Sequence, residues 1–408
     1  MGGSVSGLSG AGLQLQNNAG DTLAVSASGT FTFTSGIATG TTYAVTVLSQ
    51  PSSQTCTVQN GSGTANANVT TVLITCTSAT PLALVANSGS SNGVNGLSVY
   101  RINAATGTLS FLSNVSAGNT PYAVAVTPNG LFAYVSNQMG DSVSAYGIDN
   151  ISGVLTPLTS RVSNNASGLA MDRLGRYLWV ANYGWNTLSG FSISANGTLT
   201  PVAGSPLTTT SSLPYVITAH PTMDFVYVAF QSTFNHAVAV YSVDPVSGAL
   251  TLKQTLTNVI SSANGVVIDA SGRFLYVNDG GGVCSFAINA SSGLLSSKGC
   301  VSVSGSTFAL AIHPTGNYVY VANASNNTVT VYGVNLTTGS LAQVGAPAGV
   351  GSNPLGVTVN AAGTALYVTN YSSNDVSAFS ISGGGATLTS LGAAVTAGNA
   401  PQGIAVTP

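Results

Sequence analysis

Few side chains in this sequence could carry acid–base chemistry, because its 408 residues include three His, nine Asp and no Glu. A general acid or base needs a titratable group at the reacting atoms, and His is the commonest choice. His220 and His313 occupy one position of a recurring segment, where other copies have Thr or Asn, so we interpret both as turn residues. His236 stands alone in a loop, which is typical of a surface residue. The sequence therefore does not favour a catalytic His.

Other signatures of catalysis and cofactor binding are weak. Serine is abundant enough to leave a Ser-His-Asp triad open, but no Gly-Xaa-Ser-Xaa-Gly elbow precedes a helix, and we predict no helices. The sequence has no Gly-rich phosphate loop with its Lys. Asp141, Asp279 and Asp375 lie in or near one loop of three repeats, yet isolated carboxylates make poor Ca²⁺ sites. We expect neither a cofactor nor a metal.

The four cysteines form two local pairs, Cys56 with Cys76 and Cys284 with Cys300. An even number at hairpin spacing predicts two disulfides and an oxidising compartment; four unpaired buried thiols are the alternative. Closing the loop between Cys56 and Cys76 would contribute about 3 kcal/mol. We expect an exported protein, extracellular, at the cell surface or periplasmic, whose export signal is missing before Met1; a cytosolic chain is the alternative.

The composition narrows the range of partners. Charged residues make up 4% of the chain, against about 25% in a typical soluble protein. Nucleic-acid binding is not expected, because phosphate neutralisation needs clustered Lys and Arg, and these residues form no run. No run of roughly 18 apolar residues is present, so we expect no transmembrane segment.

Residues 82–408 repeat with a period of about 47 residues. The marker of each repeat is a buried strand that ends in a small residue and Asn, as in Tyr134-Val135-Ser136-Asn137 and Tyr320-Val321-Ala322-Asn323. An alternating strand with an aromatic near its end follows, and then a strand that begins Gly-Xaa-Leu. The two-residue alternation and the Gly and Asn punctuation predict strands. Such units of four strands are typical of β-propeller blades.

A fourth strand precedes each marker, and the first repeat lacks it upstream of Leu84. The missing copy is Gln402 to Pro408 at the end of the chain, which aligns with Tyr122 to Pro128 without a gap. The sequence therefore predicts an all-β fold with a seven-bladed β-propeller closed by its C-terminal strand. Closure is favourable because it removes open sheet edges.

Residues 1–78 have a different pattern, in which short alternating segments are separated by Asn-, Gly- and Pro-bearing turns. This pattern predicts a small antiparallel β-sandwich with Cys56 and Cys76 on its last two strands. Residues 79–81 are interpreted as a short linker, and residues 82–408 as the propeller domain.

The marker strand and the Pro-Xaa-Gly turn before it, as in Pro128-Asn129-Gly130, resemble those of the YVTN/lactonase-type seven-bladed propellers, the 6-phosphogluconolactonase-like fold. The front domain looks like sandwich modules of bacterial exported lipoproteins, which implies a lipidated Cys upstream. Lactonases of this family are understood to use His, Glu and Arg near the central channel. None of these types occurs among the residues expected to begin the innermost strands, which are Gln402, Tyr122, Ser167, Tyr215, Asn264, Phe308 and Leu355.

Because no catalytic signature was found, the sequence favours a binding face at one mouth of the channel. Aromatic side chains beside Asn and Gln suit stacking on sugar rings or packing on a protein, although capping of the blade ends is equally compatible. The candidate ligand-binding residues are Tyr183, Trp185, Phe230, Phe234, Tyr371, Tyr122, Tyr215 and Gln402.

We therefore predict a non-catalytic binding, adhesion or scaffold module whose ligand is a carbohydrate or a protein. The alternatives are a diverged lactonase-like hydrolase and a structural component of a surface layer. A lactone-hydrolysis assay separates the first two, and imaging of ordered assemblies would reveal the third.

Overall fold

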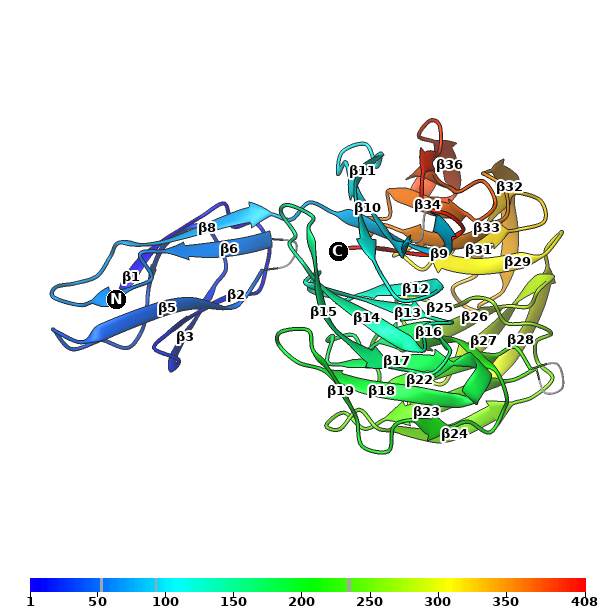
Figure 1. Cartoon of the computed structure of the whole chain (residues 1–408), viewed down its shortest axis with the longest axis horizontal. Helices are drawn as coiled ribbons and strands as arrows, with labels where there is room; N and C mark the ends of the chain where they lie inside the picture. Colours follow the sequence, from blue (N-terminus) through cyan, green and yellow to red (C-terminus); the bar gives the residue numbers. More distant parts are fainter. Residues whose placement is uncertain (52–53, 92–93, 233–235) are drawn as a thin grey trace. The chain divides into compact units, whose positions relative to one another are not determined.

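The computed structural model describes residues 1–408 except 52–53, 92–93 and 233–235, and its described part is almost entirely β (Figure 1). Two compact units are present: Met1–Thr80 with Asp149–Val154, and Pro81–Ile148 with Leu155–Pro408. The prediction of no helices was wrong in one detail, because two 3-10 turns, η1 (Tyr183–Trp185) and η2 (Gly383–Gly385), occur. In the described residues, no helix has the length and apolar character needed to span a membrane.

The first unit is a sandwich of two four-stranded sheets, with orders β4-β1-β8-β6 and β3-β2-β5-β7. Alternate residues of its strands face inward, as Val72, Ile74 and Cys76 do on β8. β1 pairs with β8 in parallel, which corrects the expectation of a purely antiparallel domain. Cys56 on β6 and Cys76 on β8 are directly paired residues and form the predicted disulfide. The strands are β1 (Gly2–Ser6), β2 (Leu13–Asn17), β3 (Asp21–Val25), β4 (Gly29–Thr32), β5 (Thr42–Ser49), β6 (Gln54–Gln59), β7 (Ser62–Thr64) and β8 (Val72–Ser78).

The second unit contains seven antiparallel sheets, the blades of a propeller. Blade 1 comprises β38 (Pro401–Val406), β9 (Leu82–Ser91), β10 (Val94–Ile102) and β11 (Leu109–Ser116). Blade 2 comprises β12 (Pro121–Val126), β13 (Phe132–Asn137), β14 (Ser142–Ile148) and β15 (Leu155–Val162). Blade 3 comprises β16 (Ala166–Met171), β17 (Tyr177–Asn182), β18 (Thr187–Ile193), β19 (Leu199–Pro201) and β20 (Leu207–Thr208), and blade 4 comprises β21 (Pro214–Ala219), β22 (Phe225–Phe230), β23 (Val238–Val243) and β24 (Leu250–Leu256). Blade 5 comprises β25 (Val266–Ile268), β26 (Phe274–Asn278), β27 (Gly282–Ile288) and β28 (Leu295–Ser302). Blade 6 comprises β29 (Thr307–Ile312), β30 (Tyr318–Asn323), β31 (Thr328–Val334) and β32 (Leu341–Gly349). Blade 7 comprises β33 (Pro354–Val359), β34 (Ala365–Asn370), β35 (Asp375–Ser382), β36 (Thr387–Ser390) and β37 (Val395–Thr396).

The innermost strand of blade 1 comes from the end of the chain. β38 pairs antiparallel with β9, with Ile404 opposite Val85 and Val406 opposite Ala83. The Thr407 hydroxyl accepts a hydrogen bond from the Leu82 amide at 2.8 Å. Five of the other innermost strands begin one residue earlier than expected, whereas β25 begins two residues later than expected, at Val266.

The marker aromatic residues connect successive blades. In five blades a Tyr hydroxyl or Trp indole N–H donates to a Gly carbonyl in the turn before the outermost strand of the next blade, at 2.8–3.0 Å. The last of these bonds, from Tyr367 to Gly107, joins blade 7 to blade 1. The Tyr276 hydroxyl of blade 5 is buried without a partner. The bonded pairs are Tyr134–Gly197, Trp179–Gly248, Tyr227–Gly293, Tyr320–Gly385 and Tyr367–Gly107.

The marker Asn residues have a structural role as well. The Asn137 amide group donates to the hydroxyls of Ser142 and Ser144 on the next strand of its blade, at 3.2 and 2.9 Å. Asn182 bonds to the hydroxyls of Thr187 and Ser189 in the same way. The repeated Asn therefore satisfies buried polar groups within a hairpin, which explains why the motif indicates fold and not chemistry.

Candidate functional site

The innermost strands of all seven blades line a cavity at one end of the central channel. Its volume is about 250 Å³, just below the usual range of small-molecule sites. Each strand contributes one aliphatic side chain at the same level; these residues are Ile404, Val124, Leu169, Ile217, Val266, Leu310 and Val357. A second cavity of about 520 Å³ lies beyond them at the other end, lined mainly by Val, Ala, Ile and Thr. We call the first end the polar mouth.

Tyr122 of the cavity lining belongs to a cluster of three tyrosines, whose other members, Tyr215 and Tyr183, are not among the lining residues. The Tyr122 hydroxyl on β12 donates a hydrogen bond of 2.6 Å to the Tyr215 hydroxyl on β21. The two ring centres are 5.4 Å apart, and Tyr183 of η1 packs edge-on against Tyr215 at 5.2 Å. Blade 3 lies between these strands and contributes the small, fully buried Ser167 at this level. The short Ser side chain leaves room for the tyrosines of blades 2 and 4 to meet.

Both hydroxyls of the pair remain protonated at neutral pH. Burial raises the pKa of Tyr215 to about 12. Burial and the adjacent Tyr215 hydroxyl raise the pKa of Tyr122 well above its ordinary value. Because Tyr122 donates to the Tyr215 oxygen, the Tyr215 proton is left to donate to a third group. The pair therefore has one hydroxyl proton free to donate and does not act as a base at neutral pH.

Amide side chains complete the polar mouth. Gln402 of β38 lines the cavity, and its Nε2 donates to the Ser88 hydroxyl at 3.2 Å. Asn264 also lines the cavity, and its carbonyl oxygen accepts a hydrogen bond from Gln231. Among the described residues, no His, Asp, Lys or Arg lines this cavity. Neutral donors and acceptors suit hydroxyl and carbonyl groups of a ligand.

The structure brings only some of the sequence-predicted site residues together. Tyr122, Tyr215 and Tyr183 form the cluster, with Gln402 in the cavity lining. Trp185 is 61% exposed on η1, and Tyr371 is half-buried outside the cavity lining. Phe234 lies outside the described residues.

The assignment of Phe230 to an exposed binding face was wrong, because the residue is fully buried in the core of blades 3 and 4. It occupies the position of the marker Asn, which is buried in the blades that have it, for example at Asn137 and Asn370. The alignment of the repeats could therefore have predicted that Phe230 is buried. The Tyr122–Tyr215 contact had no such signal, because 93 residues separate the two positions.

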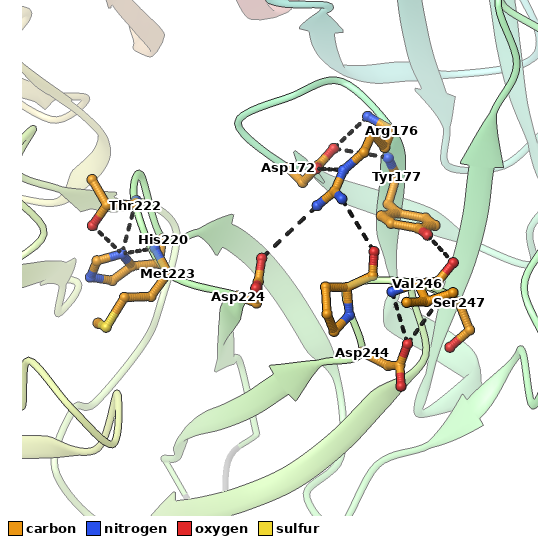
Figure 2. A network of polar contacts seen from close by, with 11 residues as sticks. Asp172, Arg176, Tyr177, His220, Thr222, Met223, Asp224, Asp244, Val246 and Ser247 are labelled. Atoms are coloured by element: carbon orange, nitrogen blue, oxygen red, sulfur yellow. Dashed lines mark hydrogen bonds and ion pairs between the residues drawn. The ribbon is translucent and has the colours of Figure 1, made fainter.

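His220 lies in the turn after β21, at the opposite end of the channel, beside Thr222 and Met223 (Figure 2). His220 accepts the Met223 amide on Nδ1 at 2.9 Å, so Nε2 carries the proton and donates to the Gly272 carbonyl of blade 5 at 2.8 Å. Burial lowers the pKa of His220. His313 contacts Gly363 of blade 7 in the same way, at 3.0 Å. Both histidines therefore act as turn residues that contact the next blade.

An ion-pair network joins blades 3 and 4 on the same face (Figure 2). Arg176 bonds to the Asp172 carboxylate at 2.8 Å and lies 4.0 Å from Asp224 of blade 4. The guanidinium also donates to the Pro245 carbonyl, and the Tyr177 hydroxyl donates to the Val246 carbonyl. These contacts satisfy the charged groups within the protein and give the network a structural role.

One other group of side chains has the composition of a metal site. Ligand atoms of Asp279, Cys284 and Cys300 lie within 4.8 Å of one another. Both sulfur atoms belong to the Cys284–Cys300 disulfide, which joins paired residues of β27 and β28 as predicted. The disulfide leaves one carboxylate as the available ligand.

The seven blades and their common channel define a seven-bladed β-propeller with a neutral, tyrosine-containing mouth. The chain matches the family described as "Lactonase, 7-bladed beta-propeller" over residues 51–166, 161–262 and 254–355. It belongs to this lactonase family of seven-bladed propellers, as the sequence repeat indicated.

Similar proteins agree with this assignment. A 6-phosphogluconolactonase of Cronobacter sakazakii (strain ATCC BAA-894) is 25% identical over 269 residues, which are 63% of this chain and 79% of that protein. The structure of the periplasmic gluconolactonase of Pseudomonas aeruginosa has a TM-score of 0.67 at 21% identity, covering 80% of this chain and 99% of the other. A Lactobacillus plantarum protein has a TM-score of 0.69 at 17% identity, covering 81% and 100%.

Proposed function

We propose that this propeller binds a sugar lactone at its polar mouth and accelerates hydrolysis of the lactone. The observation that carries the proposal is the Tyr122–Tyr215 hydroxyl pair at a small neutral cavity of a lactonase-family propeller. The names of relatives, a 6-phosphogluconolactonase and a periplasmic gluconolactonase, support this function over adhesion alone.

The reaction places negative charge where the tyrosine pair can stabilise it. Water oxygen bonds to the carbonyl carbon, the ring C–O bond breaks, one proton of that water passes to the departing ring oxygen, and the product is a hydroxy acid. The Tyr215 hydroxyl, polarised by the hydrogen bond from Tyr122, donates to the carbonyl oxygen as its charge develops. A raised pKa keeps that proton in place at neutral pH.

The expected rate acceleration depends on which hydrogen-bond donors and bases the site contains. Removal of one such donor typically costs about 10²–10³ in rate. A positioned base would add about 10²–10⁴, but the described cavity lining offers no carboxylate or imidazole. We therefore expect a modest catalyst, with an acceleration of about 10²–10³ over spontaneous hydrolysis.

The test is acid release from glucono-δ-lactone, corrected for spontaneous opening, with the native protein and three variants. Tyr215→Phe is expected to lower kcat about 100-fold, and Tyr122→Phe about 10-fold, because the second variant removes only the polarising bond. Tyr371→Phe, outside both the cavity lining and the cluster of Tyr122, Tyr215 and Tyr183, is the control and should retain full activity. A native protein no faster than solvent would contradict the proposal.

A second candidate is non-catalytic binding of a carbohydrate. It is supported by the missing base and by Trp185, a 61% exposed indole next to the tyrosine cluster in sequence. Under this function, oligosaccharides would quench Trp fluorescence in the native protein and not in Trp185→Ala, with no lactone turnover in either.

We also propose that the chain is exported. The two disulfides support an oxidising compartment, and the structurally similar Pseudomonas aeruginosa protein is described as periplasmic. Fractionation of cells that produce the native protein tests this, since recovery in the cytosol with reduced thiols would contradict it.

A further inference from the structure

The innermost strands of blades 2 and 3 are irregular where they reach the polar mouth. The ladder between β12 and β13 shifts at this point, so Tyr122 and Ala123 lie opposite the single residue Ser136. The ladder between β16 and β17 shifts in the same way at Ser167. Such a bulge interrupts the ladder hydrogen bonds and changes the direction of a side chain, so other groups must satisfy the backbone.

Two serine hydroxyls replace the lost bonds and connect three blades. The Ser136 hydroxyl of blade 2 accepts the Ala123 amide at 3.0 Å and donates to the Ser167 carbonyl of blade 3 at 2.6 Å. The Ser167 hydroxyl donates to the carbonyl of Ala181 in its own blade and to that of Tyr215 in blade 4, each at 2.9 Å. Both serine residues are fully buried, so removal of either hydroxyl would leave backbone groups without a partner.

These bonds form a chain from the residue after Tyr122 to Tyr215 itself. We infer that Ser136 and Ser167 are positioning residues that hold the backbones of the two tyrosines where their hydroxyls meet; the inference rests on the lactonase function proposed above. The hydroxyl oxygens are 2.6 Å apart, although blade 3 separates the strands that carry them. Catalytic groups must be held to within about 0.5 Å of the productive geometry, and supporting hydrogen bonds provide that precision.

The propeller fold does not require a hydroxyl at the position of Ser136. Blade 7 has Thr369 there, whose hydroxyl accepts the Gly356 amide at 2.8 Å and donates to the Gln402 carbonyl of blade 1 at 2.5 Å. A hydroxyl at this position therefore links one blade to the next, and Ser136 makes the link that leads to the tyrosine pair. In four blades the equivalent residue is Ala: Ala86, Ala181, Ala229 and Ala322.

The test observes the tyrosine pair by NMR and by catalysis. Carbon-13 at the tyrosine Cζ atom responds to hydrogen bonding of the hydroxyl, and Tyr122→Phe and Tyr215→Phe assign the two signals. Ser136→Ala is expected to fold, because four blades have Ala at this position, and to shift both signals. It should lower kcat for glucono-δ-lactone about fivefold with KM changed less than about twofold, since the pair acts in the transition state. Ser167→Ala, which breaks the second link, should shift the same signals and lower kcat similarly.

Two further variants separate positioning from general stability. Ser136→Thr restores the hydroxyl, as Thr369 supplies it in blade 7, and should have native signals and a native kcat. Tyr134→Phe removes the bond to the Gly197 carbonyl, which joins the same two blades away from the mouth. It should lower Tm without changing kcat or the signals of the pair.

Unchanged Tyr122 and Tyr215 signals in Ser136→Ala would overturn the inference and leave the proposed function standing. Equal losses of kcat in Ser136→Ala and Tyr134→Phe would overturn it as well, because they would show a loss of stability and not of positioning. If the native protein hydrolyses no lactone faster than solvent, the proposed function fails and the inference fails with it.

Discussion

Tyr367→Phe tests the bond that joins the last blade to the first. The Tyr367 hydroxyl donates to the Gly107 carbonyl at 2.8 Å, and both residues are buried. The variant removes a neutral hydrogen bond and leaves the carbonyl unsatisfied, so we expect a loss of about 1–3 kcal/mol in the free energy of unfolding. Unfolding entropy of about 2.1 cal/mol/K per residue over roughly 330 residues converts this loss into a fall of about 1.5–4 °C in Tm.

The matched control is Tyr276→Phe, at the same position of blade 5. Its hydroxyl is buried without a partner, so removing it should change stability by less than about 0.5 kcal/mol or raise it slightly. Scanning calorimetry of the two variants with the native protein measures the difference. The reasoning is refuted if the two variants shift the propeller transition equally, or if Tyr367→Phe has no effect.

Three further predictions concern closure, the disulfide and pH. Deletion of residues 402–408 removes most of β38 and exposes the edge of β9, so the truncated chain should aggregate, as light scattering would show; an unchanged monomer would contradict this. Replacing Cys56 and Cys76 with Ala should cost the sandwich about 3 kcal/mol in urea unfolding, and a cost near zero would show that the loop constraint is unimportant. The pKa of His220 is lowered in the fold, so its stabilisation is complete above the unfolded-state pKa of about 6.5 and is lost as pH falls below that value. His220→Asn, which places the side chain of Asn360 at this turn, should therefore melt with a smaller difference between pH 7.5 and 5.5 than the native protein, and an equal difference would exclude His220 as the source.

Much of the fold could be predicted because its determinants are periodic. Two-residue alternation gives strands, and the marker spacing gives blades. The alignment of Gln402 to Pro408 with Tyr122 to Pro128 predicts the last strand of blade 1. The parallel β1–β8 pair was missed, because alternation specifies which face of a strand is buried and not the direction of its neighbour.

The site was predicted only in part. The repeat predicted which residues, such as Tyr122 and Gln402, lie at the start of the innermost strands. It did not predict which side chains are exposed, as the burial of Phe230 shows. A side chain at the end of a strand faces solvent, a channel or the next blade according to how adjacent sheets pack.

The sequence by itself determined the family, the number of blades and both disulfide pairings, because each depends on local spacing that the chain repeats. Tertiary structure alone decided that Tyr122 meets Tyr215 across Ser167. The physical reason is ring closure. Strands tens of residues apart begin at the same end of one channel, so contacts at that end depend on the arrangement of the blades around the axis.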